Sequence, residues 1–128
     1  MKKNSAIISE GLDVMAEMLA PYAAQQLQGY YKKDWWREGV LNKINDTNGL
    51  PTDGDFPKLV NAMDALLSLK LINLNWQDVF AAKLSREHRN WANELITTRN
   101  KMAHMSPMSD FIDDDAWRAL DTMARLME

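Results

Sequence analysis

The sequence predicts an all-α fold, a single bundle of about five to six helices that occupies residues 1–128. Apolar residues recur at steps of three and four positions through nearly the whole chain, which is the spacing of one helix face. No stretch of useful length alternates apolar and polar residues, as a half-buried strand would. The length of 128 residues allows one hydrophobic core but not two, so we expect one domain.

The first half of the chain predicts two helices and a loop. One face of the first helix carries Ile8, Leu12, Met15, Leu19 and Tyr22. Pro21 should kink or restart that helix, because proline removes a backbone hydrogen bond and clashes with the preceding turn. Asp34 is suited to cap a second helix, which continues through Trp35 and Ile44. Residues 45–54 are rich in Asn, Asp, Gly and Pro and predict a loop.

A third helix is expected from Phe56 through Leu67. Asn73 and Asn75 should break it before a short apolar segment that starts at Trp76. The earlier pair Trp35-Trp36 could form an aromatic binding patch, although half-buried core residues at a helix start are the simpler expectation.

The second half predicts two more helices. Ser85 is suited to cap a long helix, and Pro107 should end that helical region. The aspartates at 113–115 place negative charge at the start of a last helix, where the helix dipole favours it. The predicted buried stripe of this last helix contains Trp117, Leu120, Ala124 and Met127. The helix is still amphipathic at Glu128, so the chain fits a domain cut from a longer protein better than a natural end.

Composition narrows the class of protein. The sequence contains no cysteine, which excludes disulfides and thiol chemistry and fits a cytoplasmic location. No apolar run approaches the roughly 18 residues of a spanning helix, so no membrane association is expected. The net charge of −3 argues against a dedicated high-affinity nucleic-acid binder. Positive residues nevertheless concentrate between Lys83 and Lys101, where they form either a solvated helix surface or a local basic face that guides RNA.

The segment Arg99-Asn100-Lys101-Met102-Ala103-His104, near the end of the long predicted helix, is the most informative motif. An arginine can hold a phosphate with two hydrogen bonds, and a histidine can move a proton near neutral pH. These are the two abilities that metal-free cleavage of an RNA phosphodiester requires. Arg99, Asn100 and His104 are therefore the candidate catalytic residues.

Helical geometry limits how Arg99 and His104 can act together. Arg99 falls on the apolar half of its helix, so it could instead form a structural salt bridge, for example to Asp121 or Asp64. His104 points about 140° away from Arg99 in an ideal helix, and it could simply interact with the last carbonyls. Both side chains could reach one phosphate only if the helix unwinds before Pro107 or if a second subunit supplies one of them.

If Arg99 is salt-bridged, Arg99→Ala should cost roughly 3–5 kcal/mol for a fully buried pair, and less otherwise. His104→Ala should cost under about 1 kcal/mol.

Other chemistries have weaker support in the sequence. Two histidines sixteen residues apart, without a zinc-binding motif, make a poor metal site. No glycine-rich phosphate loop and no serine in a nucleophile-elbow context occurs. We therefore expect neither a metal nor a cofactor.

The chain resembles the HEPN superfamily of small helical-bundle domains, in the branch that accompanies a eukaryotic nuclear RNA endonuclease and bacterial defence ATPases. Besides the motif at 99–104, the resemblance rests on Leu19-Ala20-Pro21-Tyr22, Trp91-Ala92-Asn93-Glu94-Leu95, Ser109-Asp110 and residues 114–123. Met102 stands where a tryptophan is expected, a change that affects packing rather than chemistry. Ser106 stands where nucleotidylated members of the superfamily have a tyrosine.

The resemblance implies an HEPN-like bundle that works as a homodimer, with both motifs in one composite cleft. It implies that Arg99 holds the scissile phosphate, that Asn100 supports its orientation, and that His104 acts as general base or acid. The expected function is RNA processing or RNA binding, with metal-independent endoribonuclease activity in an effector or toxin of phage defence or stress response. The alternative is a non-catalytic dimerisation or docking module of a larger defence protein, because many HEPN domains bind without cleaving.

Overall fold

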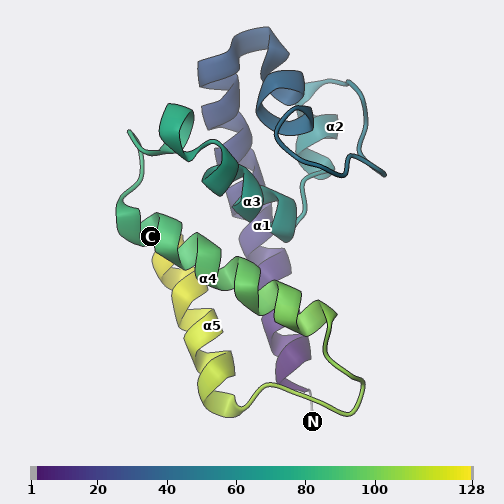
Figure 1. Ribbon diagram of the computed structural model, residues 1–128, viewed down its shortest axis with the longest axis vertical. Helices are drawn as coiled ribbons and strands as arrows, with labels where there is room; N and C mark the ends of the chain where they lie inside the picture. The colour runs from purple at the N-terminus through teal and green to yellow at the C-terminus, as the bar shows by residue number, and fades with distance from the viewer. Residues whose placement is uncertain (1–2, 128) are drawn as a thin grey trace.

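A computed structural model describes residues 3–127, and these residues form helices and connecting segments without a strand (Figure 1). The elements in chain order are α1 (Asn4–Tyr31), a 3₁₀ turn (Lys32–Asp34), a π-helical turn (Arg37–Leu41), α2 (Phe56–Asn61), α3 (Ala65–Leu74), a second π-helical turn (Trp76–Phe80), α4 (Arg86–Ala103) and α5 (Asp113–Leu126). The predicted all-α bundle is confirmed. Among these helices, none combines the length and the apolar character needed to cross a bilayer.

The first helix forms the long axis of the molecule (Figure 1). It continues through Pro21 as one element, so the restart expected there is wrong. Buried residues on both sides of the proline, including Leu19 and Ala23, pack into the core. This packing holds the helix together although the proline removes one backbone hydrogen bond.

The predicted second helix is present but shorter than expected, since the chain is helical over residues 35–41 and the helix ends before Ile44. Asp34 lies inside the 3₁₀ turn and pairs with Arg37 at 3.4 Å instead of capping a helix. Trp35 and Trp36 are both 4% exposed, so they belong to the core and not to a surface patch. The Trp36 Nε1–H donates a hydrogen bond to the Pro51 carbonyl at 2.8 Å, which fixes the 45–54 loop against the helical segment.

The predicted third helix is in fact two helices. α2 ends at Asn61, and the Asp64 side chain caps α3 by accepting a hydrogen bond from the Leu67 N–H at 2.8 Å. Apolar periodicity continues across the break and conceals it, whereas an N-cap aspartate is the local signal of a new helix start.

The core lies where α3 packs against α1 and α4, and where α5 packs against the same two helices. Its fully buried side chains include Ile8, Leu27, Leu69, Ile72, Phe80 and Leu95. Asn75 is the buried polar link between the segments. Its amide donates to the Gly39 and Leu71 carbonyls at 2.9 and 3.0 Å, and its oxygen accepts from the Tyr31 hydroxyl at 2.8 Å.

The last helix begins at Asp113 as predicted, and its predicted buried face is half right: Leu120 and Met127 are partly buried against the core, whereas the other two residues are not. Trp117 is 72% exposed, and Ala124 is also exposed. The buried residues are instead Ala116, Ala119, Thr122, Met123 and Leu126. The two alanines let the helix approach its neighbours closely, so side-chain size outweighs hydrophobicity in setting the helix rotation.

Candidate functional site

The helix that carries the motif, α4, starts at a well-formed cap. The Ser85 hydroxyl accepts the His88 N–H at 3.5 Å, and the His88 ring nitrogen Nδ1 accepts the Ser85 N–H at 3.1 Å. The predicted cap at Ser85 is therefore confirmed. The His88 ring also packs edge-on against Trp91, so this histidine has a structural role at the helix start.

The opposite end of α4 presents Asn100 and His104 to solvent. The helix ends at Ala103, and His104 is its C-cap residue. The His104 N–H donates to the Asn100 and Lys101 carbonyls, both at 3.2 Å. The histidine backbone thus completes the last turn, while its side chain makes no hydrogen bond within residues 3–127 and is available to a ligand.

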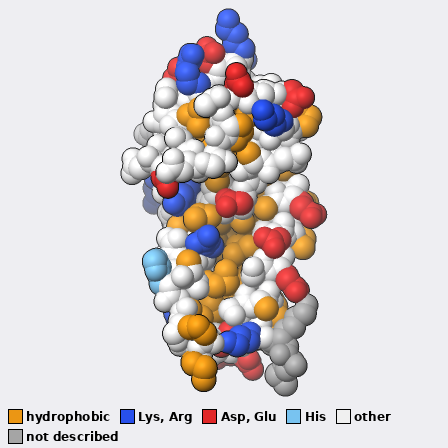
Figure 2. Space-filling model, turned by 90° about the vertical axis from the view of Figure 1, so that its right-hand side faces the viewer, with side chains coloured by type: hydrophobic (Ala, Val, Ile, Leu, Met, Phe, Trp, Pro, Cys, Tyr) orange, Lys and Arg blue, Asp and Glu red, His pale blue; other side chains and the backbone are white. Residues whose placement is uncertain are grey.

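Arg99 is partly buried and lines a hollow of about 250 Å³ between α1, the start of α3 and α4. Figure 2 views this side of the molecule and shows hydrophobic side chains in a hollow that is edged by basic and acidic groups. The other residues that line the hollow are Ser9, Leu12, Asp13, Asp64, Ala65, Leu66, Met102 and Ala103.

The salt bridge considered for Arg99 is not formed within the described part of the chain. Asp121 pairs instead with Arg125 at 2.8 Å, and the Asp64 carboxylate caps α3. No carboxylate oxygen of residues 3–127 lies within 4.0 Å of the Arg99 guanidinium. Its charge is therefore free to bind an anion that enters the hollow.

One copy of the chain does not place the three candidate residues in one cavity. The hollow that contains Arg99 reaches Met102 and Ala103 but includes neither Asn100 nor His104. α4 stays helical up to Ala103, so the unwinding that would bring His104 toward Arg99 does not occur.

The other positive residues near the motif have local partners. Arg89 donates to the Asn73 side chain at 2.8 Å and lies over the Trp76 ring. Lys101 lies over the Phe111 ring at 5.3 Å. The concentration of positive charge seen in the sequence is therefore partly used in packing. Arg99 lines the hollow between α1, α3 and α4, and Lys101 lines a separate hollow beside Phe111 and α5.

Asp110 holds the loop that follows His104 in place, through contacts that no pattern in the sequence predicts. Its carboxylate accepts the Asn4 and Ser5 N–H groups, both at 2.8 Å, and so caps α1 from a distant part of the chain. Desolvation alone would raise the pKa of Asp110, but hydrogen bonds from the Ser5, Asn4 and Phe111 N–H groups outweigh it and lower the pKa below its ordinary value.

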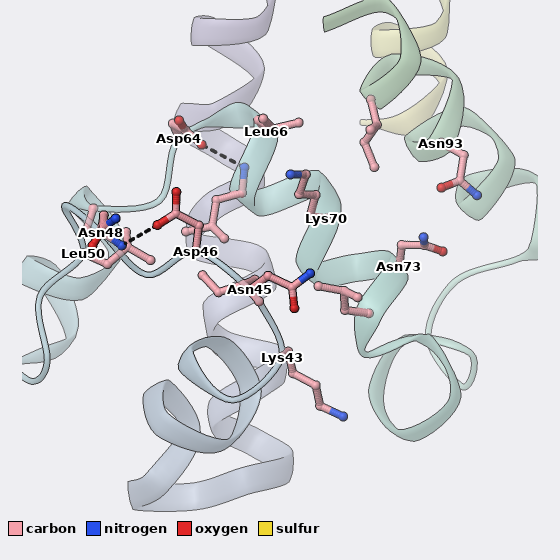
Figure 3. Close-up of a pocket in the computed structure, with 15 residues that line it drawn as sticks. Lys43, Asn45, Asp46, Asn48, Leu50, Asp64, Leu66, Lys70, Asn73 and Asn93 are labelled. Atoms are coloured by element: carbon pink, nitrogen blue, oxygen red, sulfur yellow. Dashed lines mark hydrogen bonds between the residues drawn. The ribbon is translucent and has the colours of Figure 1, made fainter. Parts of the chain in front are cut away.

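Sequence reasoning also missed a cleft of about 670 Å³ between the 43–50 loop, α3 and α4 (Figure 3). Its polar side chains include Lys43, Asn45, Lys70, Asn73 and Asn93. No sequence motif links these residues, because they come from three separate elements. Among the described residues, no three His, Cys, Asp or Glu side chains gather as a metal-binding group.

Comparison with known proteins identifies the family. The family model described as Swt1-like HEPN matches residues 10–128, a range that includes the motif at 99–104 and nearly all of the bundle. No curated protein and no solved structure matches the chain. Because the match spans most of the sequence and the fold is the expected helical bundle, the chain belongs to the Swt1-like HEPN family.

Proposed function

We propose that this HEPN domain is a metal-independent endoribonuclease whose cutting site forms between two copies of the chain. The observation that carries the proposal is the state of Arg99. Its guanidinium is partly buried in an open hollow and has no ion-pair partner within residues 3–127. Asp13 and Asp64 line the same hollow without pairing with this guanidinium, so its hydrogen-bond donors are unused in the fold and the position is suited to an anionic ligand.

The proposed reaction uses the RNA as its own nucleophile. Arg99 binds the scissile phosphate, and Asn100 supports the orientation of that phosphate. His104 removes the proton from the 2′-hydroxyl, whose oxygen attacks phosphorus while the bond to the 5′-oxygen breaks. The departing 5′-oxygen takes a proton, and the products are a 2′,3′-cyclic phosphate and a 5′-hydroxyl end.

In the proposed dimer, Arg99 and His104 of one cutting site come from different subunits. The exposed stripe of α4 includes Asn93, Thr97, Asn100 and His104. If a twofold axis lies near the C-terminal end of α4, the two copies of the motif come together, so that His104 of one copy acts on the phosphate bound by Arg99 of the other. A homodimer through α4 is therefore part of the proposal, and a role in phage defence or stress response follows from the family resemblance.

The activity is tested with single-stranded RNA in the presence of EDTA. We expect the wild-type domain to cut this RNA and leave a 2′,3′-cyclic phosphate or its hydrolysed 3′-phosphate. RNA with 2′-O-methyl groups at the cut site should resist, because its nucleophile is blocked. Activity that requires added metal, or equal cleavage of DNA and RNA, would contradict the mechanism. His104→Ala should abolish cleavage while leaving the fold intact.

A separate surface favours a second candidate, a docking function without catalysis. Large apolar side chains are exposed on α1 and α5, with Val14 at 61%, Met18 at 60% and Trp117 at 72%. Exposed apolar groups in one region commonly mark protein contacts. If the domain only docks, substitutions here should abolish partner binding, and Arg99→Ala should have no effect on function.

A further inference from the structure

The lining of the cleft between the 43–50 loop, α3 and α4 combines aliphatic and polar side chains (Figure 3). The apolar residues that line it include Ile44, Leu50, Leu66, Leu67, Leu74 and Ile96. Its volume of about 670 Å³ lies within the range of pockets that bind small molecules and cofactors. An aliphatic surface of this size can accept the flat face of one organic ring system.

Four carboxamides line the cleft beside these aliphatic side chains. Asn45 and Asn48 come from the loop, Asn73 from α3 and Asn93 from α4 (Figure 3). Asn73 accepts the Arg89 hydrogen bond through its oxygen and keeps its NH₂ group as a donor. The side chains of Asn45 and Asn93 have no hydrogen-bond partner within residues 3–127. Paired amide donors and acceptors are the groups that recognise the edges of nucleobases.

The charges of the cleft favour a neutral base over a bare phosphate. Lys43 and Lys70 are balanced by the carboxylates of Asp46 and Asp64. Each carboxylate already accepts a backbone hydrogen bond, from the Asn48 N–H at 2.9 Å and the Leu67 N–H at 2.8 Å. The two lysines have no ion pair within residues 3–127, so they can contact the phosphates on either side of a bound base.

The cleft adjoins the hollow that contains Arg99, because Asp64 and Leu66 line both. We propose that the cleft binds one unstacked nucleobase of the RNA strand whose phosphate contacts Arg99. Single-stranded RNA is commonly recognised through splayed bases, which leave their edges open to side-chain amides. This inference rests on the proposed function, and it adds a base-recognition subsite that would place the cut relative to one nucleotide.

The test measures binding separately from cleavage. The probe is a fluorescent single-stranded RNA pentamer with 2′-O-methyl groups throughout, compared with the same pentamer carrying one abasic position. The variant Asn45→Ala/Asn93→Ala removes two amides that are exposed and without hydrogen-bond partners, so the fold should be retained, as a thermal melt verifies. Asn90→Ala is the matched control, because Asn90 is exposed on the same stripe of α4 but does not line the cleft.

We expect the double variant to bind the complete pentamer about tenfold more weakly than the wild type, because it lacks two hydrogen bonds of modest strength. The affinity of the wild type should fall by a similar factor when one position of the pentamer is abasic. The double variant should bind the complete and the abasic pentamer equally well. Asn90→Ala should bind as the wild type does. Unchanged binding by the double variant, or indifference of the wild type to an abasic site at every position, would overturn the proposal.

A cleavage assay on unmodified RNA in EDTA separates this proposal from the nuclease proposal. Arg99-dependent cutting combined with normal binding by the double variant would remove the base subsite and leave the nuclease. Weakened binding by the double variant without any cutting by the wild type would support the subsite and remove the nuclease. A wild-type domain that neither binds the pentamer nor cuts RNA would contradict both.

Discussion

Arg99 carries its charge on a partly buried side chain, and no described carboxylate lies within ion-pair distance. The helical phase of the sequence correctly predicts the half-buried position. The sequence could not predict the missing partner, because both acidic candidates are used elsewhere. Asp121 pairs with Arg125 one turn along α5, and Asp64 caps α3. Such local pairs form at little entropic cost and compete well with a long-range salt bridge.

This arrangement reverses the stability prediction for Arg99→Ala. Removing Arg99 leaves no described carboxylate unpaired, so the substitution should change the free energy of unfolding by less than about 1 kcal/mol. It should still abolish RNA cleavage, because the phosphate loses its bidentate donor. Urea unfolding of Arg99→Ala beside His104→Ala checks the prediction, and both should resemble the wild type. A loss of roughly 3 kcal/mol or more for Arg99→Ala alone would show that this arginine is structural.

The anchor at Asp110 determines how the loop after His104 is held. Its carboxylate accepts the Asn4 and Ser5 N–H groups at the start of α1 and the Phe111 N–H, and so ties the segment just before α5 to α1. The folded-state pKa of Asp110 is lower than its ordinary value, so the protein binds this proton more weakly when folded. The resulting stabilisation is present above the unfolded-state pKa and is lost as pH falls through the folded-state pKa.

We predict that Asp110→Asn lowers the melting temperature at pH 7, because one charge-assisted cap of α1 becomes a neutral one. The difference from the wild type should shrink as pH falls below the unfolded-state pKa and through the lower folded-state pKa, where the wild-type carboxylate takes up its proton. Thermal melts across that range provide the measurement, with Asp53→Asn in the exposed 45–54 loop as the control. A difference that does not depend on pH would show that the carboxylate charge is not the cause.

At the scale of elements, local signals in the sequence predict more than periodicity alone does. The cap at Ser85, the loop at 45–54 and the acidic start of α5 are each present in the structure. The division of the third helix at Asp64 and the rotation of α5 are not predicted. Apolar residues continue across the break at Asp64, so periodicity does not reveal it. The rotation of α5 is predicted incorrectly from Trp117, because the helix contacts its neighbours through Ala116 and Ala119. The site motif is found in the sequence, whereas the cleft depends on tertiary packing of three elements.

At the scale of the whole molecule, two surfaces could join a second copy of the chain. The polar stripe of α4 contains the motif, and an apolar strip on α1 and α5 exposes Val14, Met18 and Trp117. Only an interface that includes the C-terminal end of α4 brings the two copies of the motif together. The catalytic proposal therefore requires that interface, and it leaves the apolar strip for other contacts.

We predict that Thr97→Glu produces a monomer, because Thr97 lies one turn before Asn100 and an added charge there would be buried in the interface that joins the two motifs. Thr97 is exposed, so the fold should not change. Trp117→Glu should leave the dimer intact. Light scattering at high protein concentration distinguishes the outcomes. A monomeric Trp117→Glu with a dimeric Thr97→Glu would place the interface on the apolar strip, and a monomeric wild type would remove the composite site.

Complementation between inactive subunits tests the composite site most directly. Arg99→Ala and His104→Ala, co-expressed with different tags, give a heterodimer in which one of two sites receives Arg99 from one copy and His104 from the other. Each homodimer should be inactive on RNA in EDTA, while the purified heterodimer should recover about half of the wild-type rate, since one of its two symmetric sites is intact. A heterodimer as inactive as the two homodimers would contradict the claim that both subunits build the site.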